Sequence, residues 1–289
     1  MNKKGIILAG GKGTRLTPLT LTTSKQLLPI YDKPMIFYPL STMILGGINE
    51  ILIITTPRDK NVFMDLLGNG SDLGIKLEYK IQEKPGGLPQ AFLIGEEFIG
   101  DSNVALILGD NLFHGDYLSE KIRKAGENYD GASIFGYSVK DPERYGVIEF
   151  NSNGSVSKIV EKPNNPKSSI VVTGLYYYDN SVVNKTKSLK VSKRGELEIS
   201  DLNNLYLNEG KLNVAIMSRG IAWLDTGTFD SLHDAGAYIR TLEKRQGLKI
   251  GSPEEASWRM GYIGEDELKY ASKKYLNSEY GKYLLELSK

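Results

Sequence analysis

The most informative stretch of this chain lies near its beginning and reads Lys4-Gly5-Ile6-Ile7-Leu8-Ala9-Gly10-Gly11-Lys12-Gly13-Thr14-Arg15-Leu16. Its apolar run, Ile6 to Ala9, predicts a buried strand. Three glycines follow, and glycine lets the backbone approach a ligand closely because it has no Cβ. A glycine loop that opens a helix presents unpaired N–H groups, which commonly bind phosphate, and Arg15 adds a bidentate cation. The stretch therefore predicts a nucleotide phosphate at the carboxyl end of the first strand, although the glycines alone would also fit a tight strand-to-helix turn.

The bulk composition excludes several classes of protein. The chain has 289 residues, enough for one large domain or two modest ones. Its 36 Lys and Arg residues balance 35 Asp and Glu residues, and the resulting net charge of +1 argues against a nucleic-acid or membrane-surface partner. It has no cysteine, so disulfides and thiolate chemistry are excluded. With no signal peptide and no bilayer-spanning run, we expect a cytoplasmic protein.

Strand and helix signals alternate through the first half of the chain. Continuous apolar strands separated by helices are typical of a parallel sheet covered on both faces. We expect an α/β fold, with a Rossmann-like, mostly parallel mixed sheet flanked by helices, and a binding edge at the carboxyl ends of the strands. The expected strands are residues 6–9, 50–55, 76–82 and 104–108, and the expected helices begin at Pro34 and Val62.

The second half is richer in strands and then becomes helical. Asn153-Gly154 predicts a hairpin turn within this β-rich part. We expect residues 1–240 to form the core, including a β-rich insertion, and residues 241–289 to form a C-terminal helical segment. The expected strands are residues 132–139, 146–150, 156–161, 170–178 and 212–217, and the expected helices are residues 196–209 and 229–246.

Two aspartates are candidate metal ligands. Asp110 follows the apolar strand 104–108, and a carboxylate at the end of a buried strand is well placed to hold Mg²⁺ together with water and substrate phosphates. Asp225 lies in the segment Trp223-Leu224-Asp225-Thr226-Gly227-Thr228. An aspartate that caps a turn is a common alternative. Spacing alone does not pair two residues that lie 115 positions apart.

The order of these motifs resembles a known family. Gly-Gly-x-Gly-Thr-Arg-Leu followed by Pro18, Lys25 and Pro29 fits neither the Rossmann fingerprint nor the P-loop. It is similar to the sugar-1-phosphate nucleotidyltransferases, over residues 3–245. The resemblance implies that dTTP and α-D-glucose 1-phosphate react, with Mg²⁺, to give dTDP-glucose and pyrophosphate, the first step of dTDP-deoxysugar (for example dTDP-rhamnose) biosynthesis. It also implies a homotetramer, which in many members is inhibited at a second nucleotide site.

The resemblance also assigns roles to residues. It implies that Asp110 and Asp225 hold the metal and that Gln82 and Gly87 read thymine, although Gly86 and Pro89 depart from the commonest form of that loop. The expected catalytic residues are Arg15, Lys25, Asp110 and Lys162. The expected nucleotide-binding residues are Gly10, Gly11, Gly13, Thr14, Arg15, Lys25, Gln82, Gly87 and Asp110. The expected sugar-phosphate-binding residues are Asn111, Tyr145, Gly146, Glu161, Lys162, Val172 and Arg194.

Two alternatives stay open at this point. The first is an enzyme of the same family that uses UTP in place of dTTP, or another sugar phosphate. Its base-binding site would differ little, since uracil lacks only one methyl group of thymine. A non-catalytic sugar-nucleotide sensor on the same scaffold would tolerate loss of Arg15, Lys25 or an aspartate, and all of them are present. The two histidines, His114 and His233, have no ligand spacing and are expected to be incidental.

Overall fold

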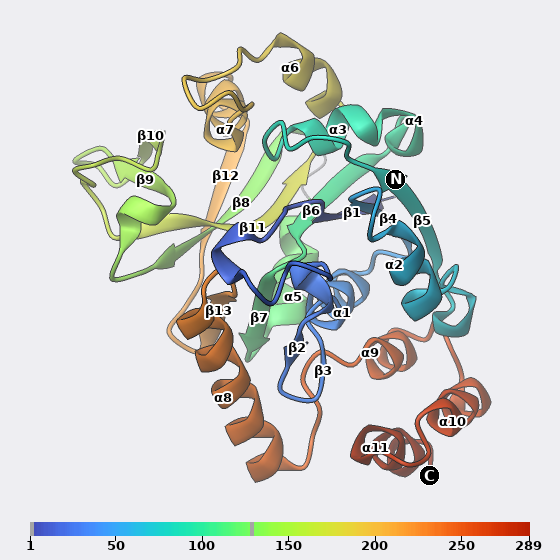
Figure 1. The fold of residues 1–289 in the computed structure, drawn as a ribbon. Coiled ribbons are helices and arrows are strands. Elements are labelled where there is room, and N and C mark those ends of the chain that lie inside the picture. Colours follow the sequence, from blue (N-terminus) through green and yellow to red (C-terminus); the bar gives the residue numbers. More distant parts are fainter. Residues whose placement is uncertain (1–2, 128–129) are drawn as a thin grey trace.

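The computed structural model describes residues 3–127 and 130–289. A nine-stranded mixed sheet crosses the molecule, and helices lie on both of its faces (Figure 1). Within the path β10-β9-β11-β6-β1-β4-β5, the last four strands are parallel to one another. The predicted α/β fold with a mostly parallel central sheet is confirmed.

The parallel half of the sheet is buried on both faces. Successive residues of β4 alternate between two apolar clusters, with Ile51 and Ile53 in one and Leu52 and Ile54 in the other. This explains why each strand reads as a continuous apolar run. The four parallel strands are β1 (Lys3–Ala9), β4 (Glu50–Thr55), β5 (Lys76–Ile81) and β6 (Asn103–Leu108).

The antiparallel half forms the β-rich part that the sequence predicts. β11 pairs with β6 and β8, and β9 and β10 form a hairpin whose turn has Gly154 at φ 81°. A positive φ is what glycine supplies in such a turn. The strands are β8 (Ala132–Ser138), β9 (Gly146–Phe150), β10 (Val156–Glu161), β11 (Ile170–Tyr178) and β12 (Leu212–Ile216), the last parallel to β8.

Two helices begin later than the sequence predicts. α1 starts at Phe37 and not at Pro34, because Lys33–Pro34 (β3) pairs with Pro29–Ile30 (β2) in a small hairpin. α7 starts at Ile199 and not at 196, because Leu197 donates its N–H to the Gly86 carbonyl at 2.9 Å. The helices of the core are α1 (Phe37–Leu45), α2 (Lys60–Leu67), α3 (Gln90–Ile94), α4 (Glu96–Ile99), α5 (Leu118–Ala125), α6 (Val182–Ser188), α7 (Ile199–Asn208) and α8 (Phe229–Gln246).

A second, two-stranded sheet was not predicted. β7 (Asn111–Gly115) pairs antiparallel with β13 (Ile221–Asp225), and Asp225 lies opposite Asn111. β7 follows directly after β6 and Asp110. The pairing therefore brings the segment around residue 225 to the carboxyl end of the central sheet.

The C-terminal helices pack together beside the core. α9 (Pro253–Arg259) contacts α1, and α10 (Glu265–Lys274) and α11 (Glu279–Leu287) close an apolar cluster around Leu268 and Leu284 (Figure 1). The boundary between residues 240 and 241 falls inside α8, and the division into two domains stays a prediction. Among the described residues, no helix combines the length and apolar character that a bilayer crossing requires.

A buried ion-pair network ties the β2–β3 hairpin to α8. Lys33 Nζ lies 2.7 Å from Glu243 Oε1, and the two side chains are 2% and 3% exposed. Lys249 Nζ also contacts Glu243, at 2.9 Å. Removing one member of a buried pair leaves its partner without compensation in a medium of low polarity, so breaking this network is costly.

We predict that Lys33→Met lowers the free energy of unfolding by roughly 2 to 3 kcal/mol, less than for a wholly uncompensated charge because Glu243 keeps Lys249. Lys124→Met is the matched control, since Lys124 pairs with Glu120 on the surface with both side chains more than half exposed. That variant should lose less than about 1 kcal/mol. Urea denaturation measures both, and equal losses would show that burial does not govern the pair.

Candidate active site

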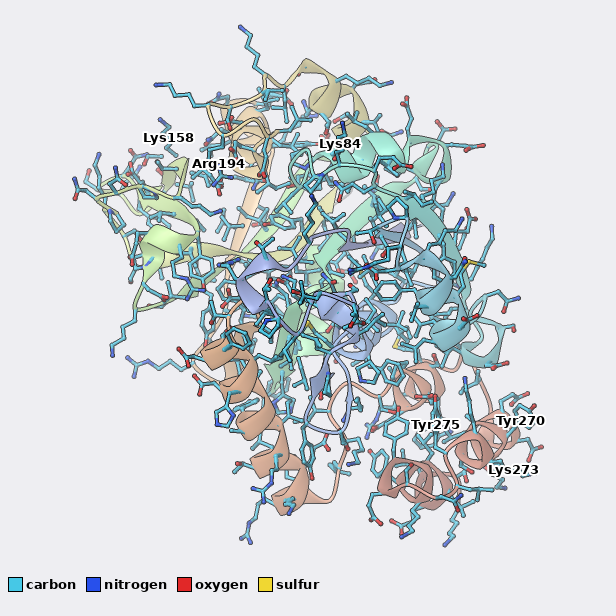
Figure 2. All side chains as sticks on the ribbon, viewed as in Figure 1. Lys84, Lys158, Arg194, Tyr270, Lys273 and Tyr275 are labelled. Carbon is cyan, nitrogen blue, oxygen red and sulfur yellow. The ribbon has the colours of Figure 1, made fainter. Side chains whose placement is uncertain are left out.

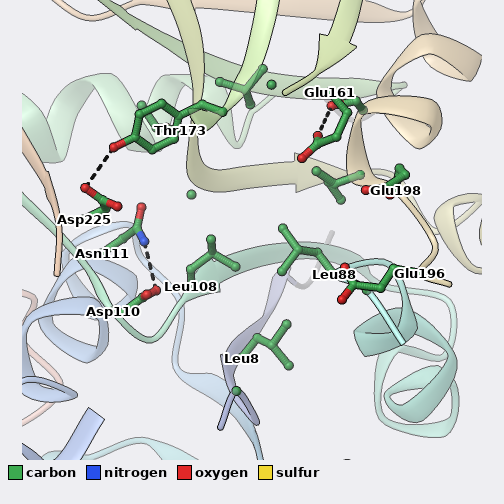
Figure 3. Close-up of a pocket in the computed structure, with 18 of the residues that line it drawn as sticks. Leu8, Leu88, Leu108, Asp110, Asn111, Glu161, Thr173, Glu196, Glu198 and Asp225 are labelled. Atoms are coloured by element: carbon green, nitrogen blue, oxygen red, sulfur yellow. Dashed lines mark hydrogen bonds between the residues drawn. The ribbon is translucent and has the colours of Figure 1, made fainter. Parts of the chain in front are cut away.

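A cavity of about 740 Å³ opens at the carboxyl ends of β1 and β6 (Figure 3). Its walls come from the glycine loop, the β7–β13 pair, the β9–β10 hairpin and the loop before α7. Most of the predicted site residues line this cavity, although they come from segments more than 200 positions apart. They are Gly11, Arg15, Lys25, Gln82, Gly87, Asp110, Asn111, Tyr145, Gly146, Glu161, Lys162, Val172, Arg194 and Asp225.

The glycine loop is built differently from a helix N-terminus. Gly13, at φ 60°, leads into a single 3₁₀ turn over Thr14–Leu16, and no α-helix follows. Gly10, Gly13 and Thr14 are absent from the cavity wall, whereas Gly11 and Arg15 are on it. The expected helix opening is therefore wrong, because Pro18 follows within a few residues and cannot continue a helix.

Gly10 makes room for another predicted site residue. A Cβ at Gly10 would lie 2.2 Å from Oε1 of Gln82. Gln82 is only 5% exposed and follows directly after β5. The first glycine thus acts in the structure by letting the Gln82 carboxamide lie against the backbone of the loop.

Lys25 and Asp110 form an ion pair in the cavity wall. Burial opposes ionisation of Asp110, but the Lys25 ammonium and a hydrogen bond from Asn111 outweigh it, and the pKa of Asp110 is lowered. The ionised carboxylate is therefore the form that the fold favours. This contribution to stability is present at neutral pH and is lost as acidification protonates Asp110, below its ordinary pKa.

Asp225 is brought near Asp110 because β13, which ends at Asp225, pairs with β7, which begins one residue after Asp110. Figure 3 shows Asn111 between the two carboxylates. The N–H and hydroxyl of Thr226 donate to the Asp110 carbonyl at 3.1 and 2.9 Å, and this fixes the chain after β13. The Tyr145 hydroxyl donates to Asp225 Oδ1 at 2.9 Å, and Arg144 Nη2 lies 3.2 Å from Oδ2. Burial, and then the Asp225 charge, raise the pKa of Tyr145, which stays a neutral donor.

The two aspartates fit the manner in which proteins hold Mg²⁺. In the described part of the chain, no group of three or more His, Cys, Asp or Glu side chains is placed to hold a metal. Mg²⁺ is usually bound through one or two carboxylates, with waters and substrate phosphates completing its shell. Two carboxylates on the wall of one cavity match this donor set.

Arg15 reaches the same end of the cavity. A Cβ at Gly227 would lie 3.2 Å from Arg15 Nη2 and 3.6 Å from Asp225 Oδ2. The absence of a side chain at Gly227 thus lets the guanidinium lie beside the Asp225 segment. The ion pairs found among the described residues do not include Arg15, and its guanidinium is available to an anion.

Glu161 lies across the cavity from the two aspartates (Figure 3), and Lys162, which follows it, is also on the wall. Ser200 donates to Glu161 Oε2 at 2.6 Å, and a Cβ at Gly146 would lie 2.8 Å from the Ser200 oxygen. Gly146 thus leaves space around this carboxylate. Lys162 has φ 42°, a left-handed conformation that is unusual for a side-chain-bearing residue, and its N–H donates to the Tyr145 carbonyl at 3.0 Å. A strained residue at a cavity wall is consistent with a functional role.

Arg194 is paired with carboxylates in this structure. Its Nε and Nη2 lie 3.0 and 2.8 Å from the two oxygens of Glu198, a bidentate contact. Glu161 and Glu196 lie further off, at 3.8 and 3.5 Å. In Figure 2 Arg194 lies in the upper part of the molecule, far from the C-terminal helices that carry Tyr270 and Lys273. An anion that engages Arg194 therefore has to compete with Glu198.

The loop between β5 and α3 joins the two ends of the cavity. Gly87 has φ 94°, and a Cβ there would lie 2.0 Å from the Leu197 carbonyl oxygen. With Leu197 bonded to Gly86, this close packing makes the loop continuous with the segment that carries Arg194. Gln82 and Gly87, the predicted base-reading residues, are both on the wall of the cavity.

Sequence reasoning gave no role to several residues that the structure places on the wall. Arg144 precedes Tyr145 and contacts Asp225, and Trp223 donates its Nε1–H to Asn111 Oδ1 at 2.6 Å. Glu198 and Ser200 stand in the same segment as Arg194, but nothing in their spacing shows which partners they contact. Other unassigned polar residues of the wall include Gln26, Thr173 and Glu196.

Comparison with known proteins identifies the class of protein. Residues 4–241 match the family model described as nucleotidyl transferase. The chain therefore belongs to the nucleotidyl transferase family, and the predicted family is confirmed.

Individual relatives indicate a particular activity within this family. The chain is 55% identical to the glucose-1-phosphate thymidylyltransferase of Mycolicibacterium smegmatis, with 98% of each chain covered, and 54% identical to that of Neisseria meningitidis, with 99% of each covered. A crystal structure of a Bacillus anthracis protein assigned the same activity, in complex with sucrose, matches with a TM-score of 0.76 and 42% identity over 82% of this chain and 95% of that one. A UDP-glucose pyrophosphorylase complexed with UDP-glucose matches with a TM-score of 0.70 and 25% identity over 83% and 100%.

We predict that Gly10→Ala destabilises the protein by about 1 to 3 kcal/mol, because the new methyl group overlaps the Gln82 carboxamide. Gly11→Ala is the matched control, since a Cβ there meets nothing within 4 Å among the described residues. Its stability should change by less than about 0.5 kcal/mol. Thermal or urea unfolding of the ligand-free proteins measures both. Equal effects of the two substitutions would contradict the contact.

Proposed function

We propose that this chain transfers a thymidylyl group from dTTP to α-D-glucose 1-phosphate, forming dTDP-glucose and pyrophosphate. The observation that carries this proposal is the convergence of Arg15, Lys25, Asp110 and Asp225 on one cavity. Near-full-length identity of 51–55% to several enzymes named glucose-1-phosphate thymidylyltransferase supports the choice of substrates. The UDP-glucose pyrophosphorylase is only 25% identical to this chain, so the comparisons support dTTP as the substrate more strongly than UTP.

The reaction needs no nucleophile from the protein. An oxygen of the sugar phosphate, which is already anionic at neutral pH, attacks the α-phosphorus of dTTP. A new P–O bond forms to that oxygen, and the bond between the α-phosphorus and the bridging oxygen of the β-phosphate breaks, so that pyrophosphate leaves. The task of the protein is therefore to align the two phosphates and to neutralise charge.

Asp110 and Asp225 are the residues that would hold Mg²⁺. When bound, this ion polarises the α-phosphate and neutralises charge on the triphosphate. The pair between Lys25 and Asp110 keeps the carboxylate ionised before substrate arrives. Lys25 is then positioned to pass to a phosphate oxygen when Asp110 takes another partner.

The remaining wall residues bind and orient the two substrates. Arg15 and Gly11 on the wall face the departing pyrophosphate, while Gly10, Gly13 and Thr14, which lie behind the wall, shape the loop, and its amides reach the phosphate only if the loop moves. Lys162 holds the attacking phosphate in line, and Arg194 adds a second contact if Glu198 releases it. Gln82 and Gly87 read the thymine. The glucose is held by Asn111, Tyr145, Gly146, Glu161 and Val172.

A second cavity is the candidate for the regulatory site that the resemblance implies. It has a volume of about 270 Å³ and lies between α1, α5 and α9, lined by Tyr38, His114, Lys249, Glu255 and Arg259 among others. Its mixture of aromatic and charged side chains suits a nucleotide-sugar. Regulation there, the homotetramer, the cytoplasmic location and the place at the start of dTDP-rhamnose synthesis stay predictions.

Release of pyrophosphate in a coupled assay tests the proposed function. The purified chain is supplied with glucose 1-phosphate and dTTP, UTP, dCTP or no nucleotide, each with Mg²⁺. Pyrophosphate and dTDP-glucose in equal amounts are expected with dTTP. A higher kcat/KM with UTP would support the alternative enzyme, and no pyrophosphate with any nucleotide would support a non-catalytic sensor.

We predict that Arg15→Ala lowers kcat by about 10²-fold or more, because it removes a positioned donor to charge that develops in the transition state. Arg123→Ala is the control, since Arg123 lies on the exposed side of α5, away from the cavity wall. Steady-state kinetics with dTTP and glucose 1-phosphate measure both variants. An Arg15→Ala enzyme that turns over at the rate of the Arg123→Ala enzyme would remove the proposed role.

We predict that Asp110→Asn raises the Mg²⁺ concentration for half-maximal activity by at least about tenfold, the loss expected when the environment of a metal is weakened. The amide keeps the shape of the side chain, so circular dichroism should be unchanged. Asp101→Asn, at an exposed turn, is the control. If the Asp110 variant required the same Mg²⁺ concentration as the wild type, Asp110 would not be a metal ligand.

A further inference from the structure

We infer that Gln90 is a positioning residue for base selection. It fixes the orientation of the Gln82 carboxamide, so that a defined atom of this group faces the nucleotide base. This orientation favours the imide of thymine over cytosine. The inference rests on the proposed function, since it takes Gln82 as the residue that reads the base. Gln90 itself is not on the cavity wall. It acts through Gln82.

The geometry is a short series of hydrogen bonds that begins at the backbone. The Gly86 N–H donates to Oε1 of Gln90 at 2.8 Å. The same oxygen accepts a hydrogen bond from Nε2 of Gln82 at 2.6 Å. Gln90 is the first residue of α3, so its backbone is held by the helix that follows.

These hydrogen bonds determine the orientation of the Gln90 carboxamide and, through it, that of the Gln82 carboxamide. A carboxamide can present either its oxygen or its NH₂ group to a neighbour, and its environment decides between them. The Gly86 backbone N–H can only donate, so the atom of Gln90 that it meets must be the oxygen. Because that oxygen also meets Gln82, the Gln82 atom that faces it must be the NH₂ group.

Oε1 of Gln82 is then left for the base. Among the described residues, none donates a hydrogen bond to this oxygen, although the residue is 5% exposed and lies against Gly10. Gly86 contributes to the arrangement by being small, since a Cβ there would lie 2.8 Å from the Gln90 carboxamide. The loop thus presents a fixed acceptor on the wall of the cavity.

A fixed acceptor discriminates between pyrimidines. Thymine and uracil carry a donor, N3–H, beside the acceptor O4, whereas cytosine carries an acceptor, N3, beside a donor amino group. Gln82 Oε1 and the Gly87 N–H are complementary to the first pattern and repel the second. If the Gln82 carboxamide could rotate by about 180°, its NH₂ group would donate to N3 of cytosine. The preference for thymine over cytosine that this side chain provides would then be lost.

The test is a competition between nucleotides. Purified wild type, Gln90→Leu and Gln90→Glu each receive glucose 1-phosphate with dTTP against dCTP, and with dTTP against dUTP, and mass spectrometry quantifies the nucleotide-sugars. The product ratio gives the ratio of kcat/KM values. Gln90→Leu removes the oxygen, whereas Gln90→Glu keeps an acceptor at the same place and suits the first turn of a helix.

In Gln90→Leu we expect the preference for dTTP over dCTP to fall by at least about tenfold, the scale of one misplaced buried hydrogen bond. The preference for dTTP over dUTP should stay within about twofold of wild type, since both bases present the same imide. Gln90→Glu should keep both preferences. If Gln90→Leu does not fold, Gln90→Ala makes the same test with a strong helix former.

Three results would overturn the inference while leaving the proposed function intact. They are unchanged ratios in Gln90→Leu, an equal loss of both preferences, which would indicate a change of pocket shape, and a Gln90→Glu enzyme that behaves like Gln90→Leu. A wild type that forms no dTDP-glucose would contradict the proposed function and the inference with it.

Discussion

The pairing of β7 with β13 is the constraint on which the rest of the site depends. It places Asp225 opposite Asn111, so that two carboxylates 115 positions apart lie at the same end of the central sheet. Thr226 then bonds to the Asp110 carbonyl, and Gly227 leaves room for Arg15. Without this small sheet, the glycine loop and Asp110 would face a cavity that has one carboxylate and one wall fewer.

The cavity is charged but internally balanced. Lys25 neutralises Asp110, Arg144 contacts Asp225, and Arg194 contacts Glu198. This balance agrees with the net charge of +1 and with the site proposed for two phosphate-bearing substrates. Apart from Arg15, these cations contact carboxylates, and under the proposed function phosphate oxygens of the substrates take the place of those carboxylates. The enzyme therefore needs no uniformly basic surface to recognise an anion.

Local patterns predicted the part of the fold that is local. β4, β9, β10, β11 and α8 have the predicted bounds because their apolar runs, the Asn153-Gly154 turn and the Thr228 cap act within a few residues. β7 and β13 were missed since each is a short mixed segment whose pairing is long-range. The late starts of α1 and α7 have the same origin, in contacts to Pro29–Ile30 and to Gly86 that no local signal encodes. The resemblance supplied the pairing of Asp110 with Asp225, but not the contacts of Arg144, Glu198 and Gln90.

Under the proposed mechanism, Arg15 and the two aspartates act on a single metal-bound triphosphate. A crystal structure of the protein with dTTP and Mn²⁺ in place of Mg²⁺ tests it most directly, because the anomalous signal of manganese locates the ion. One anomalous peak is expected in contact with Asp110, Asp225 and a phosphate oxygen, with the β- and γ-phosphates against Arg15 and the glycine loop. A triphosphate bound away from Arg15, or an ion that contacts neither aspartate, would contradict it.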